Sequence, residues 1–142
     1  MLKTNKGLTF IELVISLAII GILASIVLPL SEVAVKRSKE MALRTSLREL
    51  RQSIDKYKEK YDRGDFGAKI AGASGYPKTL DELVIKKILR KIPPDPISNS
   101  PEWGTRSFSD KFDSILSDKL DVYDVFSVSD NTALDGTKYN TW

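Results

Sequence analysis

The sequence predicts an α+β protein with one long N-terminal helix and a small antiparallel sheet. Apolar residues run almost without interruption from Leu8 to Leu30, and apolar positions then recur at helical spacing as far as Tyr61. The last third holds two short runs of β-branched and aromatic residues between turn-forming residues. We expect the first half of the helix to span a membrane and the amphipathic second half to pack on the sheet.

The composition of the chain excludes several classes of function. The chain has 142 residues and neither cysteine nor histidine, which excludes disulfides and thiolate metal sites and removes the usual general base. It contains no glycine-rich phosphate loop and no G-x-S-x-G elbow. We therefore expect a structural subunit and no enzyme; a membrane-anchored enzyme or ligand-binding protein is the alternative. Basic and acidic side chains number 18 and 10 over residues 1–94 but 4 and 9 over residues 95–142.

Residues 8–30 form the predicted membrane segment. They contain a single charged side chain, Glu12. As a helix the segment would be about 34 Å long, against about 30 Å for the hydrocarbon core of a bilayer. A signal peptide would have a shorter apolar run with a small-x-small cleavage site behind it, and a soluble domain of this size could not cover the segment on all sides. Basic residues flank both ends, so they do not decide the orientation.

Glu12 is costly at this position. A carboxylate at the centre of a membrane helix costs about 2.5–3.5 kcal/mol, and less near a helix end. Two interpretations stay open: the side chain reaches water at the interface, or it pairs with a cation in an assembly of such helices. The nearest cations are Lys6 and, after a cut behind Gly7, the new α-amino group of Leu8.

The helix is expected to continue as an amphipathic segment over residues 31–62. Its apolar positions alternate in steps of four and three along one face and are Leu43, Leu47, Leu50, Ile54, Tyr57 and Tyr61. Such a stripe can form a coiled-coil seam, but in a small domain it more often packs on a sheet. The other face mixes basic and acidic residues, which favours a solvated face with ion pairs between subunits over a surface for nucleic acid or lipid.

Residues 63–96 are expected to form a loop and a short helix. Glycines and other turn-forming residues between 62 and 77 should end the long helix and form the loop. Thr79 should then begin a short helix with Glu82 at capping-box spacing, and the prolines at 93, 94 and 96 should end it.

Residues 97–142 are expected to hold the sheet and a C-terminal loop. Strands are predicted at residues 103–108 and 120–128. Alternate residues of the second strand should share one face, namely Tyr123, Val125 and Ser127, with Val122, Asp124, Phe126 and Val128 on the other.

The N-terminal residues resemble the class III signal of type IV pilins and type II secretion pseudopilins. The resemblance rests on Lys6-Gly7-Leu8-Thr9-Phe10-Ile11-Glu12, followed by an uncharged apolar run that contains Pro29. It implies a pilin fold, with residues 1–7 as a cleaved leader, residues 8–30 as a filament-core helix and residues 31–142 as a periplasmic domain. It also implies that a prepilin peptidase cuts between Gly7 and Leu8 and that Leu8 becomes N-methylated.

The same resemblance implies a homo-oligomeric helical filament. Glu12 would face the N-terminal amine of a neighbouring subunit, where two charges that are costly alone neutralise one another. Thr9 would place a hydroxyl beside that pair. The stretch from Gly21 to Pro29 would extend on assembly, and packing of small residues between membrane helices is the alternative role of Gly21.

The last third resembles the GspG-type major pseudopilin. The features are Pro94-Asp95-Pro96, Trp103, the segment 123–127, an Asp-containing loop without cysteines, and Trp142. This implies a subunit of the periplasmic pseudopilus of type II protein secretion, held in the bacterial inner membrane before assembly. Its partners would be an inner-membrane assembly platform and minor pseudopilins, with no nucleic acid. A type IV pilin of an extracellular pilus for adhesion, motility or DNA uptake is the alternative.

The resemblance further implies one calcium ion in the segment 128–136. Calcium takes six to eight oxygen ligands, often from carboxylates spaced along a turn. Asp130 and Asp135 would be ligands, together with Asn131 and the carbonyls of residues 128 and 129. The alternative is a turn in which these side chains hydrogen-bond to nearby backbone groups.

Overall fold

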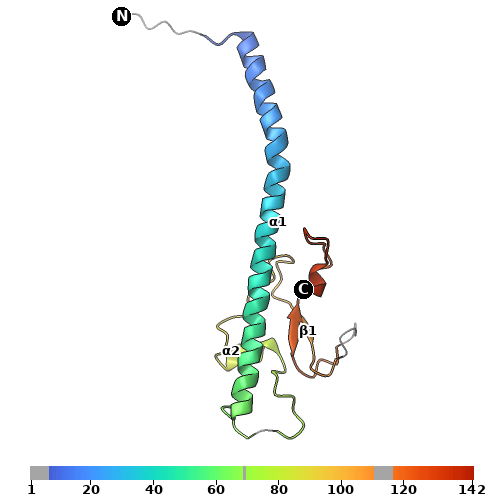
Figure 1. The fold of residues 1–142 in the computed structure, drawn as a ribbon. Coiled ribbons are helices and arrows are strands. Elements are labelled where there is room, and N and C mark those ends of the chain that lie inside the picture. Colours follow the sequence, from blue (N-terminus) through green and yellow to red (C-terminus); the bar gives the residue numbers. More distant parts are fainter. Residues whose placement is uncertain (1–6, 69, 111–116) are drawn as a thin grey trace, which may run out of the picture. The chain divides into compact units, whose positions relative to one another are not determined.

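The structure, a computed structural model, describes residues 7–68, 70–110 and 117–142. Its elements in chain order are α1 (Phe10–Arg63), α2 (Leu80–Ile85), β1 (Gly104–Arg106), β2 (Asp124–Phe126) and the 3-10 helix η1 (Tyr139–Thr141) (Figure 1). The predicted α+β fold, with one long N-terminal helix and a small antiparallel sheet, is confirmed. Residues 1–6 of the expected leader lie outside the described residues.

Helix α1 has a clear signal at each end. At its start the Thr9 hydroxyl accepts a long hydrogen bond of 3.4 Å from the Glu12 N–H, as an N-capping residue does. At its end Gly64 has a φ of +84°, which favours glycine. The N–H groups of Gly64 and Asp65 bond to the carbonyls of Tyr61 and Lys60, the pairing of a Schellman cap. The predicted end of the helix is therefore correct to within one residue.

The chain divides into two units after Arg37. In the first unit α1 is long and apolar enough to cross a membrane, by length and composition, and none of its most apolar stretch is buried. A helix that is apolar all round and unburied in water needs either lipid or other helices around it. The predicted apolar N-terminal helix is thus confirmed.

The core of the second unit is built on the predicted stripe of α1. Its first five positions are buried, from Leu43 to Tyr57, and Tyr61 is half-buried. The buried residues that complete the cluster are Leu83, Leu89, Trp103, Val122, Val125, Ala133 and Tyr139. Because the stripe is buried inside its own unit, it does not form a coiled-coil seam with another chain.

The sheet is smaller than predicted. Strands β1 and β2 are antiparallel, and the register pairs Thr105 with Val125. Val125 and Ser127 are both buried, which fits the predicted shared face, but Tyr123, expected on that face, is 48% exposed, and Val122, expected on the other face, is buried. The Val122 N–H bonds to the Pro77 carbonyl and not to a strand, so the alternation begins only where β2 begins.

Helix α2 also differs from the prediction. It ends at Ile85, before the prolines, because Lys87 adopts a φ of 56° and cannot continue the helix. The capping box is wrong as well, since the Thr79 side chain makes no capping hydrogen bond. The Glu82 carboxylate instead accepts a hydrogen bond of 2.9 Å from the Lys78 N–H, one residue earlier.

Candidate functional site

The predicted cleavage point lies just before α1. Gly7, Leu8 and Thr9 precede the helix and are exposed, and the Leu8 side chain is 73% exposed. An ideal Cβ on Gly7 would meet nothing within 4 Å among the described residues. The Gly7–Leu8 peptide bond is therefore accessible in the described structure.

Glu12 lies exposed in the first turn of α1. Its N–H contacts the Thr9 hydroxyl, and its carbonyl accepts a 2.7 Å hydrogen bond from the Ser16 hydroxyl. Within the described ranges its carboxylate has neither a hydrogen bond nor an ion pair. The positive end of the helix dipole stabilises a carboxylate at this position. The carboxylate can also bind a cation from outside the described chain.

Thr9 also caps the N-terminus of α1, a role that the sequence does not predict. The resemblance to pilins predicts that its hydroxyl lies beside an ion pair. In the single chain that hydroxyl lies against the main-chain N–H of Glu12, so Thr9 caps the helix that carries the acid. The two roles are compatible because a hydroxyl both accepts and donates.

Apolar side chains surround Glu12 and continue on all sides of α1 as far as Leu30. Exposed apolar side chains in this stretch include Phe10, Ile11, Leu13, Val14, Ile15, Leu17, Ile19, Ile20, Ile22, Leu23, Val27 and Leu30. The backbone stays helical from Gly21 through Pro29, and Gly21 has open space where a Cβ would be. Extension of this stretch on assembly stays a prediction.

The predicted calcium loop is a hydrogen-bonded turn. Asp130 accepts a 2.5 Å hydrogen bond from the Asn140 side chain. One carboxylate oxygen of Asp135 accepts hydrogen bonds from the Thr137 hydroxyl at 2.6 Å and from the Thr137 N–H at 2.9 Å. The hydroxyl bond holds the pKa of Asp135 below its usual range, and the N–H bond and Arg44 add to the effect. Asn131 takes part through its carbonyl, which accepts the Tyr139 N–H.

This arrangement supplies no preformed cluster for a cation. Over the described residues, no three Asp, Glu, His or Cys side chains gather closely enough to hold a metal ion. Asp130 and Asp135 offer the oxygen ligands that calcium prefers, but each is bonded to a different side chain. Calcium binding would require these bonds to be exchanged, so it stays a prediction.

Two residues of the charged face of α1, Glu40 and Arg51, hold the C-terminal segment in place, whereas the sequence predicts a solvated face with ion pairs between subunits. One Glu40 oxygen accepts hydrogen bonds of 2.8 Å from the Leu134 N–H and from the Tyr139 hydroxyl. Arg51 donates to Asp124 at 2.7 Å and to the main-chain oxygens of Val125 and Trp142 at 3.0 and 3.1 Å. Their partners lie 73 to 99 positions away in the chain, and no local pattern marks them.

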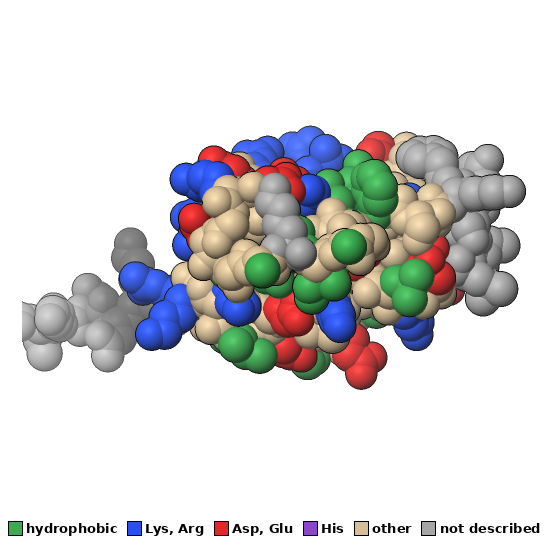
Figure 2. All heavy atoms as spheres, turned by 90° about the horizontal axis from the view of Figure 1, so that it is seen from below, with side chains coloured by type: hydrophobic (Ala, Val, Ile, Leu, Met, Phe, Trp, Pro, Cys, Tyr) green, Lys and Arg blue, Asp and Glu red, His purple; other side chains and the backbone are tan. Residues whose placement is uncertain are grey.

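Charges of both signs lie on the surface of the second unit. Figure 2 shows basic and acidic side chains interspersed on one face, as the alternating charges of residues 36–63 predict (Figure 2). Two ion pairs join residues four apart on α1, Lys58 with Asp62 and Arg63 with Glu59. Such exposed pairs contribute about 0.3–0.5 kcal/mol each.

Two buried tyrosines of the second unit bond to carboxylates. Burial raises the pKa of Tyr57 to about 12, and the nearby Glu82 carboxylate adds to the increase. Burial also raises the pKa of Tyr139 to about 12, and the hydrogen bond to Glu40 adds to it. Both values lie above that of an unfolded tyrosine, about 10, so folding favours the neutral phenol.

This linkage predicts a loss of stability in alkali. The contribution of the neutral phenols is complete below pH 10 and is lost as the pH rises from about 10 to 12. The melting temperature of residues 38–142 should therefore fall across this window. A Tyr57→Phe, Tyr139→Phe double variant should show a smaller fall, whereas Tyr123→Phe, which changes an exposed ring, should behave as the wild type. Equal falls in all three proteins would contradict the assignment.

Comparison with protein families identifies the N-terminal segment. Residues 2–28 match the model of the prokaryotic N-terminal methylation motif, which is found in type IV pilins and pseudopilins. The match covers Gly7, Leu8 and Glu12 together with most of the apolar stretch. It implies processing by a prepilin peptidase and assembly into a filament, and it supports a pilin-like or pseudopilin subunit. No solved structure matches the chain.

Proposed function

We propose that this chain is the major pseudopilin of a type II protein secretion system. It is made with a leader, held in the inner membrane by residues 8–30, and cut between Gly7 and Leu8. Leu8 then becomes N-methylated and the apolar helices assemble into a periplasmic filament. One observation carries the filament role: the methylation motif coincides with an unburied apolar helix whose first turn bears a carboxylate without a partner in the described structure.

The proposed role of Glu12 is to pair with the α-amino group of Leu8 from a neighbouring subunit. A lone carboxylate and a lone ammonium group are each costly in a dry bundle, and together they neutralise one another. The amine does not exist before cleavage, so the pair can form only in processed subunits. Apolar packing alone would allow neighbouring helices to shift along their axes by many different distances. The Glu12–amine pair would form at one of these shifts and would therefore fix it.

The assignment to secretion rests on the last third of the chain. Support comes from its resemblance to the GspG-type proteins, in particular Trp142 and an Asp-containing loop without cysteines. The periplasmic location of residues 31–142, the inner-membrane platform and the minor pseudopilins as partners belong to this proposal. The methylation motif equally supports a type IV pilin, so an extracellular pilus is the second candidate.

Mass spectrometry of the protein from its own bacterium tests the processing. We expect a mature chain that begins at N-methylated Leu8 and retains the apolar helix. A chain that keeps Met1, or one cut behind the apolar segment by a signal peptidase, would refute the proposal. Deletion of the gene then separates the two candidates: secreted enzymes should remain in the periplasm if the filament is a pseudopilus, whereas a pilin deletion removes surface fibres.

Calcium binding by the segment 128–136 is a separate proposal. A ligand that binds only the folded state raises the melting temperature. If the loop binds calcium, the ion should raise the melting temperature of residues 38–142, and Asp135→Asn should remove the increase. Asp65→Asn, an exposed residue outside the loop, is the control. If calcium does not raise the melting temperature, the calcium proposal is wrong, and Asp130 and Asp135 serve only to bond to Asn140 and Thr137.

A further inference from the structure

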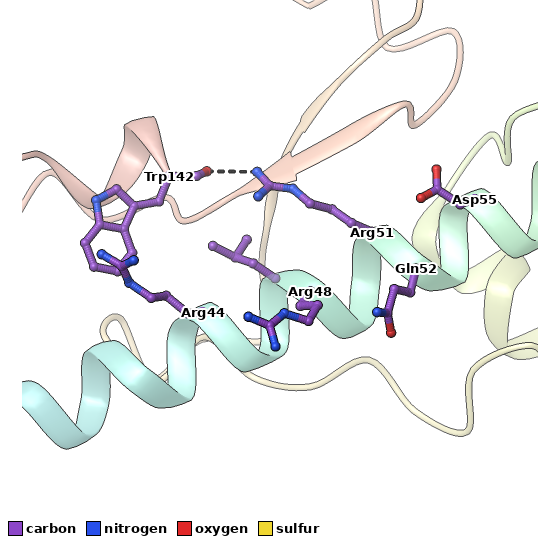
Figure 3. Close-up of a pocket in the computed structure, with 7 residues that line it drawn as sticks. Arg44, Arg48, Arg51, Gln52, Asp55 and Trp142 are labelled. Carbon is purple, nitrogen blue, oxygen red and sulfur yellow. Dashed lines mark hydrogen bonds between the residues drawn. The ribbon is translucent and has the colours of Figure 1, made fainter.

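A groove of about 460 Å³ opens along α1 within the second unit (Figure 3). Basic side chains dominate its rim, and an apolar residue and an indole ring contribute to its wall. The lining residues are Arg44, Leu47, Arg48, Arg51, Gln52, Asp55 and Trp142.

Two of the three arginines are held in place by the fold. Arg51 is fixed by its three hydrogen bonds to β2 and to the Trp142 main chain. The Arg44 guanidinium lies 4.2 Å from the centre of the Trp142 ring, a cation–π contact. Leu47 is 3% exposed and belongs to the core. The groove is therefore preformed in the single chain.

The third arginine is different. Arg48 is exposed, and in the part of the chain that the structure describes it has neither a hydrogen bond nor an ion pair. It lies between Arg44 and Arg51 on the same helix, and among the described lining residues Asp55 is the acidic one. Arg51 is paired with Asp124, and the Arg44 guanidinium lies 3.7 Å from an Asp135 oxygen. Arg48 therefore supplies the guanidinium of the groove that is not matched by a described carboxylate, and its planar fork suits one.

We propose that this groove binds an acidic surface of a second copy of the chain, supplied by residues 95–142. The proposal rests on the proposed function, which packs copies side by side. Its support is charge complementarity: residues 95–142 carry 9 acidic and 4 basic side chains. Of these acids Asp95 and Asp121 are buried and Asp124 is paired with Arg51, and the contact would use exposed ones. Glu102, Asp118 and Asp130 are exposed acids of this region, and the Glu102 carboxylate has no partner among the described residues.

Charge reversal in the full chain gives the first test. Arg48→Glu should reduce the yield of sedimentable filaments at least tenfold, and Arg48→Lys should reduce it less. Lys56→Glu is the matched control, because Lys56 is an exposed cation of α1 outside the groove. All variants should be cleaved to Leu8 and melt as the wild type, since the exposed Arg48 side chain has neither a hydrogen bond nor an ion pair within the described chain. Filaments of Arg48→Glu at the level of Lys56→Glu would overturn the proposal.

Disulfide cross-linking gives the second test, because the chain has no cysteine of its own. Arg48→Cys chains are co-expressed with chains that carry Glu102→Cys, Asp118→Cys or Asp130→Cys. At least one combination should give a cross-linked dimer in filaments, and the same combinations with Lys56→Cys should not. Failure of all three, or cross-links to another protein only, would overturn the groove assignment. If the processed wild-type chain forms no filament, the proposed function fails and the groove proposal fails with it.

Discussion

Glu12→Ala is expected to abolish filament assembly in cells while leaving membrane insertion and cleavage intact. The change removes the single charge of residues 8–30, so the segment becomes more apolar and inserts at least as well. The Thr9 cap bonds to the main-chain N–H of residue 12, which alanine retains. What is lost is the carboxylate that would receive the amine of the neighbouring Leu8.

The measurement is the amount of processed protein in sheared or sedimented filaments, with the N-terminus checked by mass spectrometry. Glu12→Gln keeps the size of the side chain but not its charge, and should assemble as poorly as Glu12→Ala. Glu32→Ala removes an exposed acid of α1 outside residues 8–30, and should assemble normally. Normal filaments from Glu12→Gln would show that the pair is not what sets the register.

The features that the sequence predicts well are those whose causes are local. Helix α1 follows from apolar spacing at 3.6 residues per turn and from Gly64, which needs a positive φ. The methylation motif is equally local: it matches residues 2–28, and the residues of the proposed cleavage and pairing, Gly7, Leu8 and Glu12, lie within six residues of sequence. A motif of this kind can be recognised without knowledge of the rest of the fold.

The features that the sequence predicts poorly depend on distant partners. Asp95 and Ser127 are both fully buried and joined by a hydrogen bond of 2.6 Å across 32 positions. Asp95 also accepts the Ile97 N–H, so the proline-rich stretch is held by a buried carboxylate. No periodicity marks such a contact. For the same reason the length of β2 and the burial of Val122 depended on where other segments lie, and propensity alone extended the strand too far.

Leu50→Ala is expected to have the largest effect on the stability of the second unit. Leu50 is fully buried at the centre of the α1 stripe, between Leu47 and Ile54. Truncation of a buried leucine typically costs about 2–5 kcal/mol of unfolding free energy, from lost apolar burial and from the cavity left behind. For a unit of this size that corresponds to a fall in melting temperature of at least about 10 °C.

Thermal unfolding of residues 38–142, followed by circular dichroism, measures this effect. Met41→Ala on the same helix is the control: Met41 is 59% exposed, so its truncation should change the unfolding free energy by no more than about 0.5 kcal/mol. In the full chain Leu50→Ala should still be cut behind Gly7, because the cleavage point lies in the other unit. The two substitutions thus separate two requirements: Glu12→Ala leaves a stable unit that cannot assemble, and Leu50→Ala leaves an intact assembly segment attached to an unstable unit. A Leu50→Ala protein that melts within a few degrees of the wild type would contradict the described core.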